Sequence, residues 1–253
     1  MELSYCHTKP IIVSFWVAII DIRKDAFVTD KTTQKTQDPF IHLHLHSEYS
    51  LLDGGNKIDD LLERVKSFGM SAVAVTDHGN LYGAFEFYSK ALAANIKPIL
   101  GIEAYVAIGD RKERKQTGIR DGGFHLVLLA ENNIGWNNIV KLSSDSFLNG
   151  FYYRPRMDHS TLEQYAEGII AINGHLGSSI AYHLCRFVDT GEQSDWDNAI
   201  KEAKWHAKTF SPNEKGDPRF YIELQRHDVQ DQIAINPYLV KLAKELDLPL
   251  VCD

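Results

Sequence analysis

Residues 40–54 read FIHLHLHSEYSLLDG, and within this stretch His42, His44 and His46 alternate with leucines. Successive side chains of an extended strand point to opposite faces. We therefore expect a strand over residues 40–45, with the imidazoles facing one shared space and the leucines packed outward under helices. Imidazole is a good ligand for transition metals, so three imidazoles on one face predict a metal site.

From residue 39 onward, short apolar runs alternate with amphipathic stretches. Buried strands are unbroken β-rich runs, and helices show apolar residues spaced by three and four. The predicted strands are 40–45, 71–76, 98–106, 124–130, 168–172, 219–224 and 248–252. The predicted helices are 58–68, 82–93, 134–147, 178–187, 195–209 and 230–246. This alternation predicts a parallel sheet, and about seven such units favour an α/β barrel of the TIM type over an open sheet.

Further candidate ligands fall at or just after the ends of the predicted strands. The carboxyl ends of barrel strands carry the active site, so these groups are expected to converge. They are Asp53, Asp77, His78, Glu103, His175 and Asp253. A His, Asp and Glu cluster without thiolates suits Zn²⁺, Mn²⁺ or Fe²⁺, and so many ligands indicate two or three ions. Clustered divalent ions activate water and neutralise a phosphoryl oxygen, which predicts phosphoester hydrolysis.

The composition limits the class of protein. The chain has 253 residues and a net charge of −7, which argues against a protein that coats DNA by neutralising many phosphates. Its three cysteines are far apart and form no CxxC pair, which favours a reducing cytoplasm. The longest apolar run, residues 11–20, is too short to span a bilayer, so no membrane association is expected.

Six segments together resemble the PHP (polymerase and histidinol phosphatase) family, and within it the N-terminal PHP domain of bacterial DNA polymerase III alpha subunits. They are HLHLHSEYSLLDG, AVTDHGNLYGAFEFY, IKPILGIEAYV, HLVLLAENNIGWNNIVKLSS, GFYYRPRMD and FYIELQRHD. The first is shared by PHP proteins in general, whereas the last two are typical of the polymerase group. The resemblance covers residues 40–253 and implies a distorted (βα)₇ barrel that binds up to three metal ions.

By motif, the resemblance implies eight metal ligands in this chain: His44, His46, Asp53, His78, Glu103, His125, His175 and Asp253. His125 is included on the resemblance alone, because it begins a predicted strand instead of ending one. The family's closing Asp-x-His falls at Asp253, and its final histidine would lie just beyond. Residues 39–253 are thus expected to form a PHP domain truncated at its C-terminal end, preceded by a leader over residues 1–38 to which no structure is assigned. No catalytic group is implied beyond water activated by the metals.

Five other residues are candidates for supporting roles. His42 precedes the ligand pair and is expected to support the ligands or the local structure. Asp77 is expected either to orient His78, to bridge metals, or to cap the strand end. Three arginines are candidates for contacting a DNA phosphate, with a solvated or packing role as the plainer alternative. They are Arg154, Arg156 and Arg226.

The resemblance implies a metal-dependent phosphoesterase domain of a replicative DNA polymerase, with Zn²⁺ or Mn²⁺ in its site and 3′–5′ exonuclease proofreading as its activity. The implied partners are the 3′ end of a DNA primer and other replisome subunits. The family's palm motif, PDxDxDF, does not occur in the sequence, so the chain alone is not expected to polymerise DNA. Two alternatives stay open. One is a free-standing phosphatase for a small phosphomonoester such as histidinol phosphate, and the other is a non-catalytic scaffold.

Overall fold

The structure, a computed structural model, describes residues 40–51 and 53–253. The predicted leader over residues 1–38 lies outside this part of the chain. The strands are β1 (Ala72–Val75), β2 (Lys97–Val106), β3 (Phe124–Ala130), β4 (Phe151–Tyr152), β5 (Arg154–Met157), β6 (Ile169–Asn173), β7 (Phe220–Leu224) and β8 (Leu250–Cys252). The helices are α1 (Ile58–Ser67), α2 (Ala84–Ala93), α3 (Asn133–Leu148), α4 (His159–Gln164), α5 (Ser179–Thr190), α6 (Gln193–Thr209) and α7 (Gln230–Glu245). Six of the seven predicted strands and all six predicted helices are confirmed, with small shifts at their ends.

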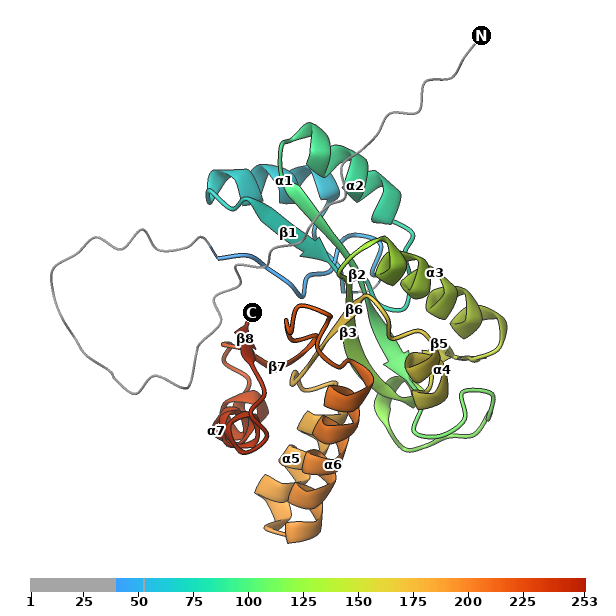
Figure 1. The fold of residues 1–253 in the computed structure, drawn as a ribbon, viewed down its shortest axis with the longest axis vertical. Helices are drawn as coiled ribbons and strands as arrows, with labels where there is room; N and C mark the ends of the chain where they lie inside the picture. The colour runs from blue at the N-terminus through green and yellow to red at the C-terminus, as the bar shows by residue number, and fades with distance from the viewer. Residues whose placement is uncertain (1–39, 52) are drawn as a thin grey trace, which may run out of the picture.

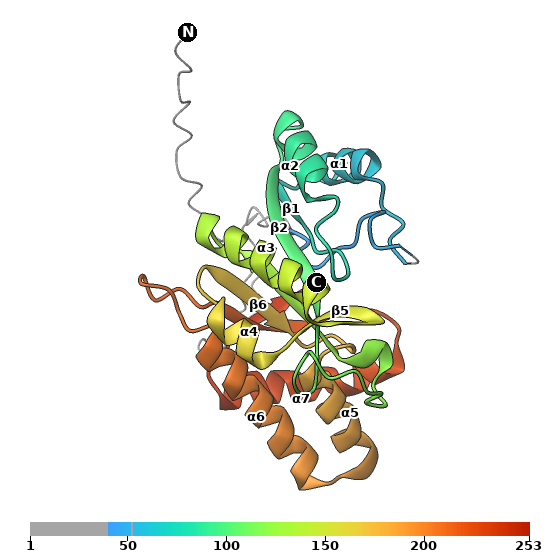
Figure 2. The same cartoon turned by 90° about the vertical axis from the view of Figure 1, so that its right-hand side faces the viewer.

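One sheet runs through the molecule in the order β4-β5-β2-β3-β6-β7-β8, and β1 pairs with the first half of β2. Helices α1 and α2 lie at one end of this sheet, and α5, α6 and α7 lie at the other (Figures 1 and 2). Four of the seven strand pairs are parallel, whereas β3 is antiparallel to both β2 and β6, and the short β4 is antiparallel to β5. The prediction of an all-parallel sheet is therefore wrong at β3, because strand direction depends on long-range pairing that local periodicity does not record.

The sheet curls, and residues 42–45 lie between β1 and the residue that follows β8. The amides of Ala74 and Thr76 in and after β1 donate to the carbonyls of His42 and Leu45. On the other side, the carboxylate of Asp253, directly after β8, accepts the amides of residues 43 and 44. The result is a mixed α/β fold with a half-barrel sheet, which confirms the expected barrel-like class.

The first predicted strand, 40–45, does not form. The chain bends at Leu43 and His44, whose amides bond to the Asp253 carboxylate instead of a neighbouring strand. Because of this bend the two leucines do not share a face. Leu43 packs with the barrel interior, whereas Leu45 packs against the cluster beneath α1 and α2. The expectation that both leucines pack outward is wrong for Leu43.

The interior face of the curled sheet changes character along the strands. At one end it is apolar, with Ile99 of β2, Leu129 of β3 and Ile170 of β6 in a single cluster. Toward the carboxyl end of the parallel strands, the same face carries Glu103 of β2 and Glu223 of β7, both fully buried. Buried carboxylates are rare unless they are paired or bind metals, so this end of the barrel is where a site is expected.

Helix packing follows the sequence pattern closely. Helix α1 buries Ile58, Leu61, Leu62 and Val65 along one face, as its three-and-four spacing predicts. Helix α3 begins after Asn132, whose side chain accepts the amides of the first turn. Of the described helices, none is long and apolar enough to cross a membrane.

The segment GFYYRPRMD forms the short hairpin of β4 and β5. Strand β5 pairs with the last residues of β2, and Met157 is buried in the main core. Helix α4 follows at once, capped by Asp158, whose side chain accepts the amide of Thr161. Both elements are too short to produce a periodic apolar pattern, which explains why they were not predicted.

A buried histidine on α6 makes the stability of the fold depend on pH. His206 is 3% exposed, lies in hydrogen-bonding distance of the Glu202 carbonyl, and stacks on Phe220. Burial lowers the pKa of His206 to about 4. Because this folded-state value is below the ordinary value of about 6.5, the stabilisation is present above pH 6.5 and is lost as pH falls toward 4, by about 3 kcal/mol at most.

Replacing this side chain, His206→Gln, is expected to flatten the fall in stability over that pH range. Urea unfolding of both proteins at several pH values measures the effect. Since the other histidines titrate in both proteins, only the difference between the two curves reports on His206. Curves that stay parallel from pH 6.5 to 4 would contradict the assignment.

Candidate metal centre

The carboxylate of Glu103 lies at the centre of five imidazoles. Three of them approach Oε2 and two approach Oε1, so both oxygens are surrounded by nitrogen atoms. The contacts to Oε2 are His44 Nε2 at 3.2 Å, His46 Nε2 at 3.0 Å and His78 Nδ1 at 3.0 Å. The contacts to Oε1 are His125 Nδ1 at 2.8 Å and His175 Nε2 at 3.0 Å. Six of the eight predicted ligands are thus gathered at one point.

Four members of this cluster lie in or next to strands at the same rim of the barrel, whereas His44 and His46 lie in the bent segment before α1. His78 follows β1, Glu103 lies in β2, and His175 follows β6. His125 begins β3, which made its position puzzling in the sequence. Because β3 is antiparallel to β2, its first residues lie at the rim where the parallel strands end, and His125 pairs in register with Tyr105.

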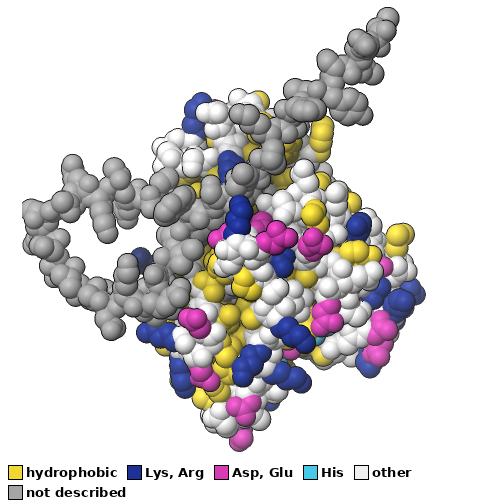
Figure 3. Space-filling view, in the orientation of Figure 1, with side chains coloured by type: hydrophobic (Ala, Val, Ile, Leu, Met, Phe, Trp, Pro, Cys, Tyr) yellow, Lys and Arg dark blue, Asp and Glu magenta, His cyan; other side chains and the backbone are white. Residues whose placement is uncertain are grey.

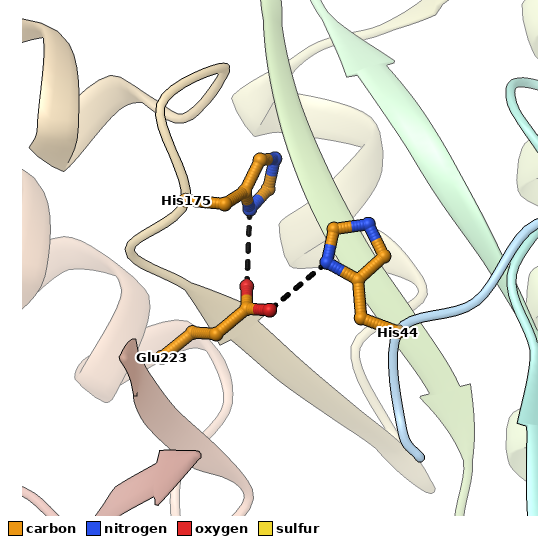
Figure 4. A group of neighbouring side chains, drawn as sticks. All are labelled: His44, His175 and Glu223. Atoms are coloured by element: carbon orange, nitrogen blue, oxygen red, sulfur yellow. Dashed lines mark hydrogen bonds and ion pairs between the residues drawn. The ribbon is translucent and has the colours of Figure 1, made fainter. Parts of the chain in front are cut away.

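Glu223 is a member of the site that the sequence analysis missed. It is 0% exposed, and its two oxygens contact two different imidazoles, as Figure 4 shows. Oε1 lies 3.0 Å from His44 Nδ1, and Oε2 lies 3.2 Å from His175 Nδ1. The signal was available, because a single glutamate interrupts the apolar strand FYIEL and a buried charge needs a partner.

Several polar atoms around Glu103 are buried without a hydrogen-bond partner: His44 Nε2, His78 Nδ1, His175 Nε2 and Glu103 Oε2. Such atoms are rare in native interiors and call for a specific explanation such as an ion. Two ligand atoms on one tetrahedral Zn²⁺ lie about 3.3 Å apart, given bonds of about 2.0 Å, and the spacings here are similar. The donor set therefore fits divalent metal ions.

Three groups of side chains could each hold an ion. Glu103 belongs to two of them and His44 belongs to two, so neighbouring ions would share ligands. The groups are His44 with His46 and Glu103, His78 with Glu103 and His125, and His44 with His175 and Glu223. Shared ligands are consistent with the expected two or three ions, because bridging carboxylates hold such ions close together.

The charges in this cluster support one another. Burial disfavours charge on Glu103, but the surrounding imidazoles outweigh it and hold the pKa of its carboxyl well below the usual range. Burial likewise opposes charge on His44, yet the carboxylates of Glu223 and Glu103 raise the pKa of its imidazole. The pKa of His78 is instead lowered, mainly by burial. Without ions, paired protons and carboxylates hold the cluster together, and metal binding would displace those protons.

The remaining acidic candidates lie at different distances from this centre. Asp53 is at its mouth, with a half-exposed side chain whose Oδ2 is 2.8 Å from His78 Nε2. Asp253 belongs to none of the three ligand groups. Its carboxylate contacts His42 Nδ1 at 2.9 Å and two backbone amides instead. Through these contacts Asp253 and His42 hold the histidine segment, and the ligand role of Asp253 stays a prediction.

The Asp77 carboxylate supports the site through two serines, Ser47 and Ser50, and not through the His78 side chain. Its carboxylate accepts hydrogen bonds from the amide and hydroxyl of Ser47 and from the hydroxyl of Ser50. The Ser50 hydroxyl in turn accepts the amide of His78 and lies 3.4 Å from His46 Nδ1. Asp77 therefore fixes the loop of Ser47 and Ser50 that follows His46. Of the three roles predicted for Asp77, this one is most like a cap at the strand end.

The three arginines differ in what they can reach. Arg154 lines the cavity beside the cluster and is held by Asp121 through two short contacts. Arg156 is 2% exposed and donates to the carbonyls of residues 111, 113 and 150, so it stabilises the loop and is not available to phosphate. Arg226 is exposed after β7 and does not line the cavity. Of the three, only Arg154 keeps the predicted substrate role as a proposal.

A cavity of about 970 Å³ opens onto the imidazole cluster. His78, His125 and His175 form part of its wall, together with Asp53 and Arg154. On the face of the molecule in Figure 3, basic and acidic side chains are interspersed over the described surface. Arg154 is the one lysine or arginine among the described residues that line the cavity, so positive charge for a phosphate would come mainly from ions at the cluster.

The sequence of the chain matches a family model and several relatives. The model of the PHP domain matches residues 42–227. The DNA polymerase III subunit alpha of Borreliella burgdorferi is 45% identical over 211 residues, which are 83% of this chain and 17% of that protein. The corresponding subunits of Thermus aquaticus and Campylobacter jejuni are 43% and 40% identical over 215 residues, which are 84% of this chain and 17% of each protein. The chain thus spans only a small part of the length of these relatives.

A solved structure of a proposed metal-dependent phosphoesterase from Bifidobacterium adolescentis is similar, with a TM-score of 0.46 and 12% identity, over 84% of this chain and 86% of that one. The stronger findings are those in sequence, where both the family model and the relatives cover most of the chain. This chain belongs to the PHP domain family and matches the N-terminal region of bacterial DNA polymerase III alpha subunits.

Proposed function

We propose that the chain is the metal-dependent phosphoesterase domain of a bacterial DNA polymerase III alpha subunit and removes the terminal nucleotide from the 3′ end of a mispaired primer. Its ions are proposed to be Zn²⁺ or Mn²⁺. The observation that carries the proposal is the buried Glu103 carboxylate with five imidazoles around it, several of their atoms lacking any other partner. Its partners would be primer DNA and other replisome subunits, in the cytoplasm.

Different residues of the chain would have different roles at the metal site. When bound, divalent ions supply Lewis acidity and lower the pKa of water to near neutrality. Glu103 and the imidazoles would hold the ions in position. The Glu223 carboxylate would fix the His44 and His175 rings through their Nδ1 atoms. Arg154, on the cavity wall, would pair with a phosphate oxygen and orient the scissile ester.

The alternatives are a phosphatase for a small phosphomonoester and a non-catalytic scaffold. The size of the cavity favours a substrate larger than a small phosphomonoester. The buried nitrogens that face Glu103 without forming a hydrogen bond argue against a pure scaffold, because a site kept only for packing would leave them at a cost of about 1–3 kcal/mol each.

The test compares metal content and substrate preference. After dialysis against Zn²⁺ or Mn²⁺, the chain is expected to retain ions and to release nucleoside monophosphate from a mispaired primer faster than it releases phosphate from histidinol phosphate. Chelation should stop the reaction, and added metal should restore it. A chain that retains no ions would support the scaffold, and a preference for histidinol phosphate would support the phosphatase.

Matched variants make this comparison specific to the site. His78→Ala removes one imidazole from the cluster and is expected to reduce turnover by about 100-fold, the upper range for loss of a group that positions a metal. His159→Ala is the control, since its partly exposed ring stacks on Trp205 away from the cluster. Equal losses in both variants would contradict the assignment.

A further inference from the structure

Much of the cavity wall beside the imidazole cluster is aromatic. Eight of the residues that line it are tyrosine or phenylalanine. A cavity built only for a phosphate group would present polar donors, not rings. The wall therefore contains a surface that the chemistry of the metal cluster alone does not explain.

The outer part of this wall is a row of exposed rings from separate elements. The ring centroid of Tyr82, before α2, lies 6.2 Å from that of Phe147 of α3. The ring centroid of Phe147 lies 6.2 Å from that of Phe151 of β4, and these two rings are nearly parallel. Their exposed fractions are 65%, 37% and 48%. Rings at such spacing that are left open to solvent can accept further flat groups on their faces.

Tyr153 lines the same cavity as these rings and has an unfavourable backbone conformation. It forms the turn between β4 and β5, since Tyr152 pairs directly with Arg154. Its φ is +60°, a region that glycine adopts easily and tyrosine does not, and its side chain is 74% exposed. A strained residue that is mostly exposed contributes little burial to the fold, and such residues are concentrated at functional sites.

Few of the described side chains on this wall carry a positive charge. Arg154 is the one lysine or arginine among the described residues that line the cavity, and Asp121 already pairs with it. Binding through phosphate contacts would need several basic groups, as in proteins that neutralise a nucleic-acid backbone. Stacking on aromatic rings needs none and accepts every base.

From these observations we infer that the ring row of Tyr82, Phe147, Phe151 and Tyr153 is a subsite that stacks the unpaired bases at the 3′ end of single-stranded DNA. The inference rests on the proposed function, because it concerns the nucleotides next to the bond that the cluster would cut. It narrows that function to an unpaired end, since paired bases already stack on one another and would have to separate first.

The experiment measures base stacking directly, without hydrolysis. A single-stranded oligonucleotide with 2-aminopurine at its 3′ end is titrated with the chain in the presence of a chelator. Stacking on an aromatic ring quenches the fluorescence of this base, so binding at the row is expected to lower it. The same base placed about ten nucleotides away should keep its emission. An oligonucleotide with two abasic positions at its 3′ end should bind about tenfold more weakly.

Two variants separate this role from a structural one. Tyr153→Gly removes the ring and relieves the strained φ, so it should unfold at the same temperature as the unaltered chain or higher, yet bind about tenfold more weakly. Phe85→Ala is the matched control, because Phe85 is 82% exposed on α2 and does not line the cavity. Its affinity should not change. The affinity of the unaltered chain should also depend only weakly on salt.

Each contrary result is informative. Unquenched fluorescence, equal affinity of Tyr153→Gly and the unaltered chain, or equal binding of the abasic oligonucleotide would overturn the subsite. A change from dimer to monomer in Tyr153→Gly would assign the rings to a contact between copies, which also overturns it. Cleavage of a mispaired primer without quenching would overturn the subsite and leave the proposed function in place. Quenching without cleavage in the presence of metal would support the subsite and overturn the proposed function.

Discussion

Glu103→Gln is expected to abolish metal binding and, with it, cleavage of a mispaired primer. The carboxylate is 2% exposed, and each of its oxygens faces at least two imidazole nitrogens. Glutamine keeps the size but removes the charge, and its amide group places a donor where lone pairs should meet an ion. Because two of the three ligand groups contain Glu103, we expect a loss of metal affinity of more than about 100-fold.

Stability measurements distinguish this loss from simple unfolding. Zn²⁺ or Mn²⁺ should raise the melting temperature of the unaltered chain, since an ion that binds only the folded state stabilises it, and should leave that of Glu103→Gln unchanged. In the absence of metal, the variant should be less stable by about 3 kcal/mol, the cost of leaving buried imidazoles without their charge partner. Glu63→Gln, on the exposed face of α1, is the control. A variant that still melts higher with Zn²⁺ would refute the central role of Glu103.

The sequence predicted the helices and most strands because their apolar periodicity is local. It also brought together the correct set of strand ends, since a β/α barrel places the carboxyl ends of its strands at one rim. His125 could not be placed this way, because its rim position depends on the reversed direction of β3. Pairing direction is decided by contacts between distant segments, and no short pattern records it.

Two acidic residues show a related limit. Asp253 follows a strand end, as the ligand pattern requires, but its carboxylate is already bound to His42 and to the backbone of the bent segment. Glu223 was passed over inside an apolar strand, although its burial makes a partner necessary. Spacing along the chain identifies candidates, whereas the competition between partners for one carboxylate is settled only in three dimensions.

Glu223→Gln is expected to weaken metal binding by about 10- to 100-fold while the fold remains intact. Glu223 accepts from Nδ1 of both His44 and His175, which leaves the Nε2 atom of each ring free to face Glu103 (Figure 4). A carboxylate behind a metal-binding imidazole fixes its tautomer in this way, and losing it typically costs that range of affinity. Glutamine has one acceptor and one donor group, so it can satisfy only one of the two rings.

In Glu223→Gln, the ring that faces the amide nitrogen of the new side chain must carry its proton on Nε2, the atom that should bind the ion. Nitrogen NMR of the metal-free proteins detects this change at a pH above the raised pKa of both imidazoles, where each ring carries one proton, because the two ring nitrogens have different shifts in each tautomer. We expect one imidazole of the pair to switch in the variant, and Zn²⁺ titration to show the weaker affinity. Gln225→Ala is the control, since the Gln225 amide donates to the same carboxylate at 3.0 Å but touches no imidazole of the cluster. The alternative is that Glu223 itself binds an ion, together with the Nδ1 atoms of His44 and His175. In that case both rings would keep their tautomers in Glu223→Gln, and the shorter carboxylate of Glu223→Asp would not restore metal affinity.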